Sequence, residues 1–121
     1  MKKIVLIENN LIFSQKIAAN LKGLGYAVQV EQSFDSVRVE AETGISAIIV
    51  DLAARGMDGL GMVKNIKSAP ETAAIPVIGF CGHAEKELME KATANGCEIV
   101  TTNGKITSDL PALLNKIKLR D

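Results

Sequence analysis

Short apolar runs alternate with amphipathic segments along the whole chain. The apolar runs are rich in Val and Ile, which favour β-strands, and they lie at residues 4–7, 27–30, 47–50, 77–80 and 99–100. The first, third and fourth runs carry no charged or amide side chain, which indicates strands buried on both faces of a sheet. The second run alternates, so Gln29 is expected to face water and this strand is expected at an edge.

The segments between these runs carry apolar residues at helical spacing. They predict helices over residues 11–24, 34–42, 59–67, 84–95 and 108–119. The first helix is expected to bury Ile17, Leu21 and Leu24 on one stripe. Either Asn9 or Asn10 could cap its start, because a side-chain oxygen there accepts a hydrogen bond from the first turn.

Five strands alternating with five helices indicate an α/β domain with a parallel sheet. Right-handed crossovers favour a doubly wound, flavodoxin-like sandwich of three layers, with the five strands in the order 2-1-3-4-5. Thr107 or Ser108 is expected to cap the last helix, with Pro111 in its first turn. No linker or repeat interrupts the pattern, so residues 1–121 are expected to form one domain.

Composition narrows the classes of function. Hydrophobic residues make up 47% of the chain and charged residues 23%, as in soluble globular proteins. Lys plus Arg and Asp plus Glu number 14 each, so no basic excess indicates a nucleic-acid or membrane surface. The start MKKIVLIE resembles a signal peptide, but Glu8 interrupts its apolar run. No stretch is long enough to span a bilayer, and a cytoplasmic location is expected.

Polar and sulfur-containing side chains follow the predicted strands where each strand ends. They are Glu8 and Asn9, Asp51, Cys81, and Thr102 and Asn103. The carboxyl ends of parallel strands lie at one edge of a sheet, and ligands bind there between the first and third strands. Cys97 is expected at the opposite edge, too far from Cys81 for a disulfide.

Three segments resemble the receiver domains of response regulators. Residues 51–59, DLAARGMDG, resemble the phosphoacceptor loop of that family. Residues 75–78, IPVI, resemble the entry to its fourth strand, and residues 94–98, ANGCE, resemble the segment that leads into its fifth. The resemblance extends over about residues 3–119. It implies a bacterial-type signalling module of a two-component phosphorelay rather than an enzyme.

The resemblance also implies a chemistry for the pocket. Asp51 stands at the position that takes a phosphoryl group from a histidine kinase, and Mg²⁺ would be held by Glu8, Asn9, Asp51 and the backbone carbonyl of Ala53. Mg²⁺ prefers such oxygen ligands. A carboxylate that attacks a phosphoryl group brings anions together, and positive charges offset their repulsion.

The resemblance further implies an output face. In the family the signal leaves through the fourth helix, the fifth strand and the fifth helix. These correspond to residues 84–95, 97–102 and 108–119. The partner would be a histidine kinase, a phosphotransfer protein or a downstream effector, and a homodimer is an alternative. No nucleic acid or membrane is expected.

Several positions depart from the family pattern. Asn9 replaces an aspartate that ligates the metal directly, so Mg²⁺ binding should be weakened. Cys81 replaces a serine or threonine whose hydroxyl contacts the phosphoryl group, and a thiol is a poor donor. Asn103 replaces a lysine and Val100 an aromatic switch residue. Lys105 could supply the missing cation, since it would point to the same side in an extended chain.

These departures indicate an atypical receiver, or pseudo-receiver, that acts through protein contacts with little or no phosphorylation of Asp51. The alternative is a phosphorylatable receiver with Mg²⁺ bound by Glu8, Asn9 and Asp51. Simpler interpretations are that Asp51 caps a turn, that Glu8 and Asn9 cap a helix, and that Cys81 is a packing residue. A small-ligand sensor is a further class, but no Gly-x-Gly-x-x-Gly motif or P-loop supports it.

Overall fold

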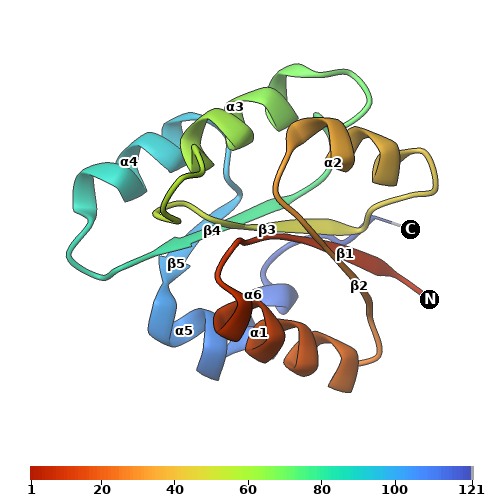
Figure 1. Cartoon of the computed structure of the whole chain (residues 1–121), viewed down its shortest axis with the longest axis horizontal. Coiled ribbons are helices and arrows are strands. Elements are labelled where there is room, and N and C mark those ends of the chain that lie inside the picture. The colour runs from red at the N-terminus through yellow and green to blue at the C-terminus, as the bar shows by residue number, and fades with distance from the viewer. Residues whose placement is uncertain (121) are drawn as a thin grey trace.

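A parallel sheet of five strands forms the middle layer of the fold (Figure 1). The computed structural model describes residues 1–120, and Asp121, the last residue of the expected domain, lies outside them. The strands are β1 Lys3–Ile7, β2 Ala27–Glu31, β3 Ala47–Asp51, β4 Val77–Cys81 and β5 Ile99–Thr102. Their order is β2-β1-β3-β4-β5 and each neighbouring pair is parallel, which confirms the predicted fold class.

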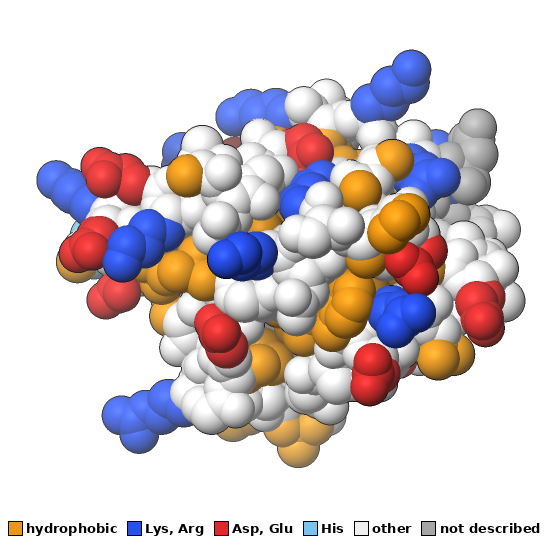
Figure 2. Space-filling model, turned by 90° about the horizontal axis from the view of Figure 1, so that it is seen from above, with side chains coloured by type: hydrophobic (Ala, Val, Ile, Leu, Met, Phe, Trp, Pro, Cys, Tyr) orange, Lys and Arg blue, Asp and Glu red, His pale blue; other side chains and the backbone are white. Residues whose placement is uncertain are grey.

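Helices cover both faces of this sheet. They are α1 Leu11–Gly23, α2 Phe34–Ala41, α3 Gly59–Ser68, α4 Lys86–Ala94, α5 Asn103–Ser108 and α6 Leu110–Asn115. Figure 1 shows α2, α3 and α4 on one face and α1, α5 and α6 on the other. Figure 2 looks onto the first of these faces, where acidic and basic side chains are interspersed around apolar ones. Within residues 1–120, no helix has both the length and the apolar character that a membrane crossing requires.

The core lies on both sides of the sheet because successive side chains of a strand point to opposite faces. In β1, Val5 and Ile7 pack under α2 and α3, whereas Ile4 and Leu6 pack against α1 and the C-terminal helices. All residues of β3 and β4 are buried, as predicted for strands covered on both faces. The second strand lies at the edge and exposes Gln29, again as predicted.

Helix α1 has a predicted cap, but one of its predicted buried residues is exposed. Asn10 is the cap, and its side chain accepts a hydrogen bond of 2.9 Å from the backbone N–H of Phe13. Ile17 and Leu21 are fully buried, but Leu24 is 44% exposed. The prediction for Leu24 was wrong because the helix ends at Gly23, one residue before it.

The prediction of a single helix over residues 108–119 was also wrong. Helix α5 begins directly after β5, and a second short helix, α6, ends at Asn115. The predicted caps, Thr107 and Ser108, lie inside or at the end of α5; instead Thr102 accepts the capping hydrogen bond from the backbone N–H of Lys105.

Pro111 explains the break between α5 and α6. A proline has no N–H to donate to the carbonyl four residues earlier, so α5 cannot continue through it as one regular helix. Asp109 has left the helical conformation, and Pro111 occupies the first turn of α6, where a missing N–H has no cost. The fourth predicted helix, 84–95, is shorter as well, at Lys86–Ala94.

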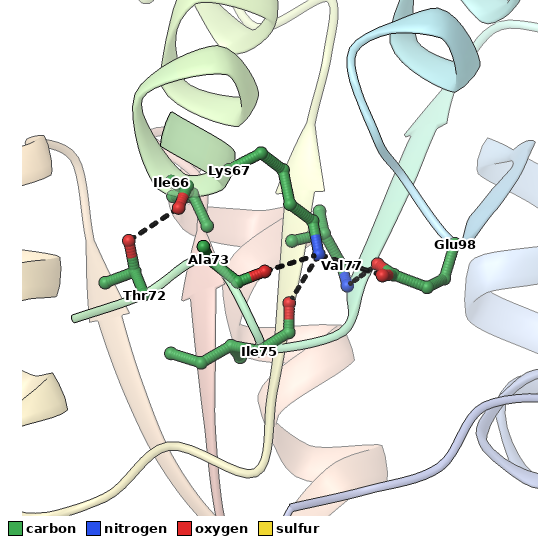
Figure 3. Close-up of polar contacts among 7 residues, drawn as sticks. All are labelled: Ile66, Lys67, Thr72, Ala73, Ile75, Val77 and Glu98. Atoms are coloured by element: carbon green, nitrogen blue, oxygen red, sulfur yellow. Dashed lines mark hydrogen bonds and ion pairs between the residues drawn. The ribbon is translucent and has the colours of Figure 1, made fainter. Parts of the chain in front are cut away.

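A polar cluster ties the amino end of the sheet to α3 (Figure 3). Lys67 Nζ donates to the carbonyl of Ile75 at 2.8 Å and forms an ion pair with Glu98 at 2.9 Å. The other carboxylate oxygen of Glu98 accepts a hydrogen bond of 2.7 Å from the N–H of Val77, the first residue of β4. We call these contacts the Lys67 cluster. It fixes the start of β4, whose other end reaches the predicted pocket.

Candidate functional site

Glu8 and Asp51 meet at the carboxyl edge of the sheet. The register of β1 and β3 pairs Ile7 with Val50, so Glu8 and Asp51 follow as neighbours. Asp51 is 9% exposed and Glu8 is fully buried. These carboxyl groups were predicted to face one another, and the structure brings them together.

The carboxyl group of Glu8 is partly engaged by the backbone that follows it. Its Oε2 accepts hydrogen bonds from the N–H groups of Asn9 at 3.1 Å and Asn10 at 3.3 Å. Its Oε1 is buried and has no hydrogen-bond partner when the group is ionised. Burial, a hydrogen bond to Asp51 and repulsion by the Asp51 charge raise the pKa of Glu8 from 4.5 to about 7. The protonated form of Glu8 can donate to Asp51, which would give the second oxygen a partner.

The Asn9 side chain contacts the loop after β3. Its Nδ2 donates a hydrogen bond of 2.6 Å to the carbonyl oxygen of Arg55. The Asn9 oxygen was predicted as a metal ligand, and no contact with Arg55 was predicted. This contact was missed because Arg55 takes part through its backbone, which its residue type does not reveal.

Side-chain hydrogen bonds and two glycines determine the shape of the phosphoacceptor-like loop. Asp51 Oδ1 accepts a hydrogen bond of 3.1 Å from the N–H of Ala53, which turns the chain back after β3. Gly56 has a φ of 74°, which favours glycine. Asp58 caps α3 through a hydrogen bond of 2.9 Å from Gly61, and a Cβ at Gly59 would lie 2.7 Å from Leu52 Cα. Gly56, Asp58 and Gly59 thus set the path of this loop.

Cys81 lies at the end of β4 and is fully buried. Burial raises the pKa of its thiol, and the negative charges of Glu85 and Asp51 raise it further. The thiol therefore stays protonated and unreactive at neutral pH. Cys81 and Cys97 are both free, as predicted. Glu85 was not singled out from the sequence, although its place just after β4 could have indicated it.

The remaining pocket positions come from the end of β5. Asn103 is the first residue of α5, and its carbonyl accepts a hydrogen bond of 3.1 Å from the Thr107 hydroxyl. Lys105 is exposed and belongs to the same helix, so the extended chain that was expected to direct it toward the pocket is not present. Val100 is partly buried against the core under α3 and α4.

The residues of this pocket do not fit Mg²⁺ well. Within residues 1–120, no group of three or more His, Cys, Asp or Glu side chains could hold a metal ion. Two carboxyl groups, Glu8 and Asp51, are adjacent, but one Glu8 oxygen is engaged by backbone N–H groups. The unpartnered Oε1 of Glu8 is the feature that would favour a cation, but Asn9, the next residue, contributes no charge to such a site.

Comparisons with known proteins agree with this fold. No family model matches the chain. The response regulator PleD of Caulobacter vibrioides is 24% identical over 94 residues, which are 78% of this chain and 20% of PleD. The chain thus spans about a fifth of the length of this curated relative.

Solved structures show the same architecture. The receiver domain of the sensor histidine kinase PA1611 from Pseudomonas aeruginosa PAO1, which has a magnesium ion coordinated in its active site cleft, superposes with a TM-score of 0.80 at 22% identity and covers 95% of both chains. The signal receiver domain of the DNA-binding response regulator merR from Colwellia psychrerythraea 34H gives 0.78 at 23% identity, over 95% of this chain and 99% of that chain. The chain has the fold of response-regulator receiver domains.

Proposed function

We propose that this chain is an atypical receiver, a signalling module of a two-component phosphorelay that acts through protein contacts with little or no phosphorylation of Asp51. The shared fold and the similarity to named response regulators support the receiver part of this proposal. The altered pocket on an intact scaffold supports the atypical part. No catalytic activity of its own is proposed.

The observation that carries the proposal is the charge of the pocket. An incoming phosphoryl anion would meet the Asp51 carboxylate, and the Glu8 carboxyl group beside it supplies no positive charge; Glu85 is close enough to raise the pKa of Cys81. Among residues 1–120, neither Glu8 nor Asp51 forms an ion pair with a lysine or arginine. Phosphoryl transfer depends on positive charge that offsets this repulsion. The pocket therefore lacks the groups that would contribute most to the rate of transfer.

The groups that would sense a phosphoryl group are also altered. The Cys81 side chain is fully buried and carries a thiol in place of a hydroxyl. Asn103 opens α5 with an uncharged side chain where the family has a lysine. Val100 cannot act as the aromatic switch of β5. Each change removes a contact through which phosphorylation would alter the output face.

The proposed output face consists of α4, β5 and the helices α5 and α6. Exposed charges of both signs line α4, where Lys91 and Glu87 form an ion pair of 3.1 Å. Such a mixed surface suits a protein partner such as a histidine kinase, a phosphotransfer protein or an effector, or a second copy of the chain. It does not suit nucleic acid or an anionic membrane.

A small phosphodonor tests the proposal. The protein is incubated with acetyl phosphate and Mg²⁺, and intact mass is measured for the wild type, Asp51→Asn and the triple variant Asn9→Asp, Cys81→Thr, Asn103→Lys. We expect little or no phosphoryl adduct on the wild type and a clear adduct on the triple variant, whose pocket regains the missing groups. Asp109→Asn serves as a matched control, because Asp109 is exposed and its side chain makes no capping bond.

The opposite result would support the phosphorylatable alternative. A stoichiometric adduct on the wild type that disappears in Asp51→Asn would show that Asp51 accepts phosphate despite the altered pocket. Mg²⁺ would then have to be held by Glu8, Asn9, Asp51 and the Ala53 carbonyl, with Lys105 as the substitute cation. The atypical receiver would in that case be rejected.

A further inference from the structure

Asn9 joins two loops that lie far apart in the sequence. It follows β1, whereas Arg55 belongs to the loop after β3, and 46 positions separate them. The hydrogen bond from Asn9 Nδ2 to the Arg55 carbonyl is short, at 2.6 Å. Both residues are exposed, so the bond lies at the surface of the carboxyl edge of the sheet.

An aspartate could not make this contact. A carboxylate has no N–H, so it would place one oxygen against another at hydrogen-bond distance. A divalent cation can join such oxygens, because it takes oxygen ligands from several segments at once. An amide and a carbonyl join the same two loops with no charge and no ion. The two arrangements require different residues at position 9.

The backbone around Asn9 is fixed from the other side. The buried Glu8 accepts a hydrogen bond from the Asn9 N–H at 3.1 Å, which sets the direction of the Asn9 side chain. Asp51 accepts a hydrogen bond of 3.1 Å from Ala53, which sets the start of the loop that carries Arg55. The donor and the acceptor are therefore held in place by the two carboxyl groups that a receiver would use for a metal.

We propose that the hydrogen bond between Asn9 and the Arg55 carbonyl takes the place of a divalent cation and holds the pocket loops together without metal. The loop at residues 52–58 is then ordered in the resting protein, and Mg²⁺ adds nothing to its order. This inference rests on the geometry of Asn9 and holds whatever the phosphorylation state of Asp51.

Hydrogen exchange of the loop tests this proposal. Peptides that cover residues 52–58 are followed by mass spectrometry in EDTA and in millimolar Mg²⁺, and thermal midpoints are measured alongside. In the wild type, we expect the same loop exchange and the same midpoint in both buffers. In Asn9→Leu, which loses the donor, loop exchange should rise about fivefold, and Mg²⁺ should not reverse the rise.

Asn9→Asp provides the decisive comparison. It loses the donor but adds a carboxylate beside Glu8 and Asp51, so its loop exchange should rise in EDTA and return toward the wild-type value in Mg²⁺. Asn65→Asp, on the exposed side of α3, is the matched control for the added charge and should show no Mg²⁺ effect. Far-UV circular dichroism identifies any variant that does not fold.

Three results would overturn the proposal. The first is a wild-type loop that exchanges more slowly, or a midpoint that rises, when Mg²⁺ is added. The second is a folded Asn9→Leu variant whose loop exchange is unchanged. The third is a folded Asn9→Asp variant that gains no response to Mg²⁺. If neither variant folds, the comparison of the wild type in the two buffers decides alone.

Discussion

Glu8 is a carboxyl group whose environment differs strongly from water. It is fully buried, contacts Asp51 and has a pKa raised from 4.5 to about 7. The folded state therefore binds more protons than the unfolded state between these pH values. The free energy of unfolding must then fall as pH rises through this range and level off above it.

This dependence gives a prediction for Glu8→Gln. We expect the wild type to lose about 1–3 kcal/mol of stability between pH 4.5 and 8, from the linkage of one raised pKa to folding. The glutamine variant should lose much less, because its amide stays neutral and can donate to Asp51 as the protonated acid does. Urea unfolding at several pH values in EDTA measures both slopes.

The exposed Glu90 on α4 offers the control. Glu90→Gln should keep the pH slope of the wild type. A Glu8→Gln variant with the same slope as the wild type would show that Glu8 ionises in the folded protein much as it does in water, and that the proton shared with Asp51 is not present.

At the level of elements, the contact between α3 and the end of β3 depends on one glycine. A Cβ on Gly59 would lie 2.7 Å from Leu52 Cα and 2.8 Å from the Asp51 carbonyl oxygen, which are backbone atoms that cannot move aside cheaply. Helix α3 therefore begins against the strand only because position 59 has no side chain.

Two glycine-to-alanine variants test this contact. Gly59→Ala should destabilise the protein by about 1–3 kcal/mol, as overpacking does, and should displace α3 from Asp51. Gly23→Ala should be neutral or stabilise by up to about 1 kcal/mol, since that glycine ends α1 with no atom within 4 Å of a Cβ. Denaturant unfolding compares them, and equal midpoints would contradict the close approach.

Most elements could be predicted from the sequence, because strands that are apolar on both faces and helices that end at glycine have strong local signals. The end of the chain could not, because Leu110, Leu113, Leu114 and Ile117 keep helical spacing beyond Asn115, where α6 ends, whereas residues 103–108 carry no such pattern. Pro111 did not reveal the break before it, because a proline fits equally well in the first turn of the predicted helix. At the site, the pairing of Glu8 with Asp51 followed from the sheet order. The Arg55 carbonyl could not be predicted, because a backbone acceptor can be found only from the path of its loop.

For the molecule as a whole, the Lys67 cluster joins α3, the segment before β4 and the segment before β5. Lys67 is largely buried and its ammonium group contacts the backbone between α3 and β4 as well as Glu98 before β5. Lys67→Met should therefore destabilise the protein by about 1–3 kcal/mol, since carbonyl groups and Glu98 lose their partner.

Arg38 provides a matched control for this change. Its ion pair with Glu71 joins side chains that are 51% and 43% exposed, so Arg38→Met should alter stability by less than about 1 kcal/mol. Thermal unfolding of both variants measures the difference. Equal midpoints would show that Lys67 acts as an ordinary surface lysine.

The Lys67 cluster and the pocket occupy opposite ends of the same strands, and this separation has a consequence for how the sequence can diverge. Substitutions at distant sites with no shared partners have nearly independent effects on stability. Changes at Asn9, Cys81 or Asn103 therefore leave the cluster that holds the strand starts untouched. A chain built this way can exchange the chemistry of its pocket over generations while its architecture stays constant.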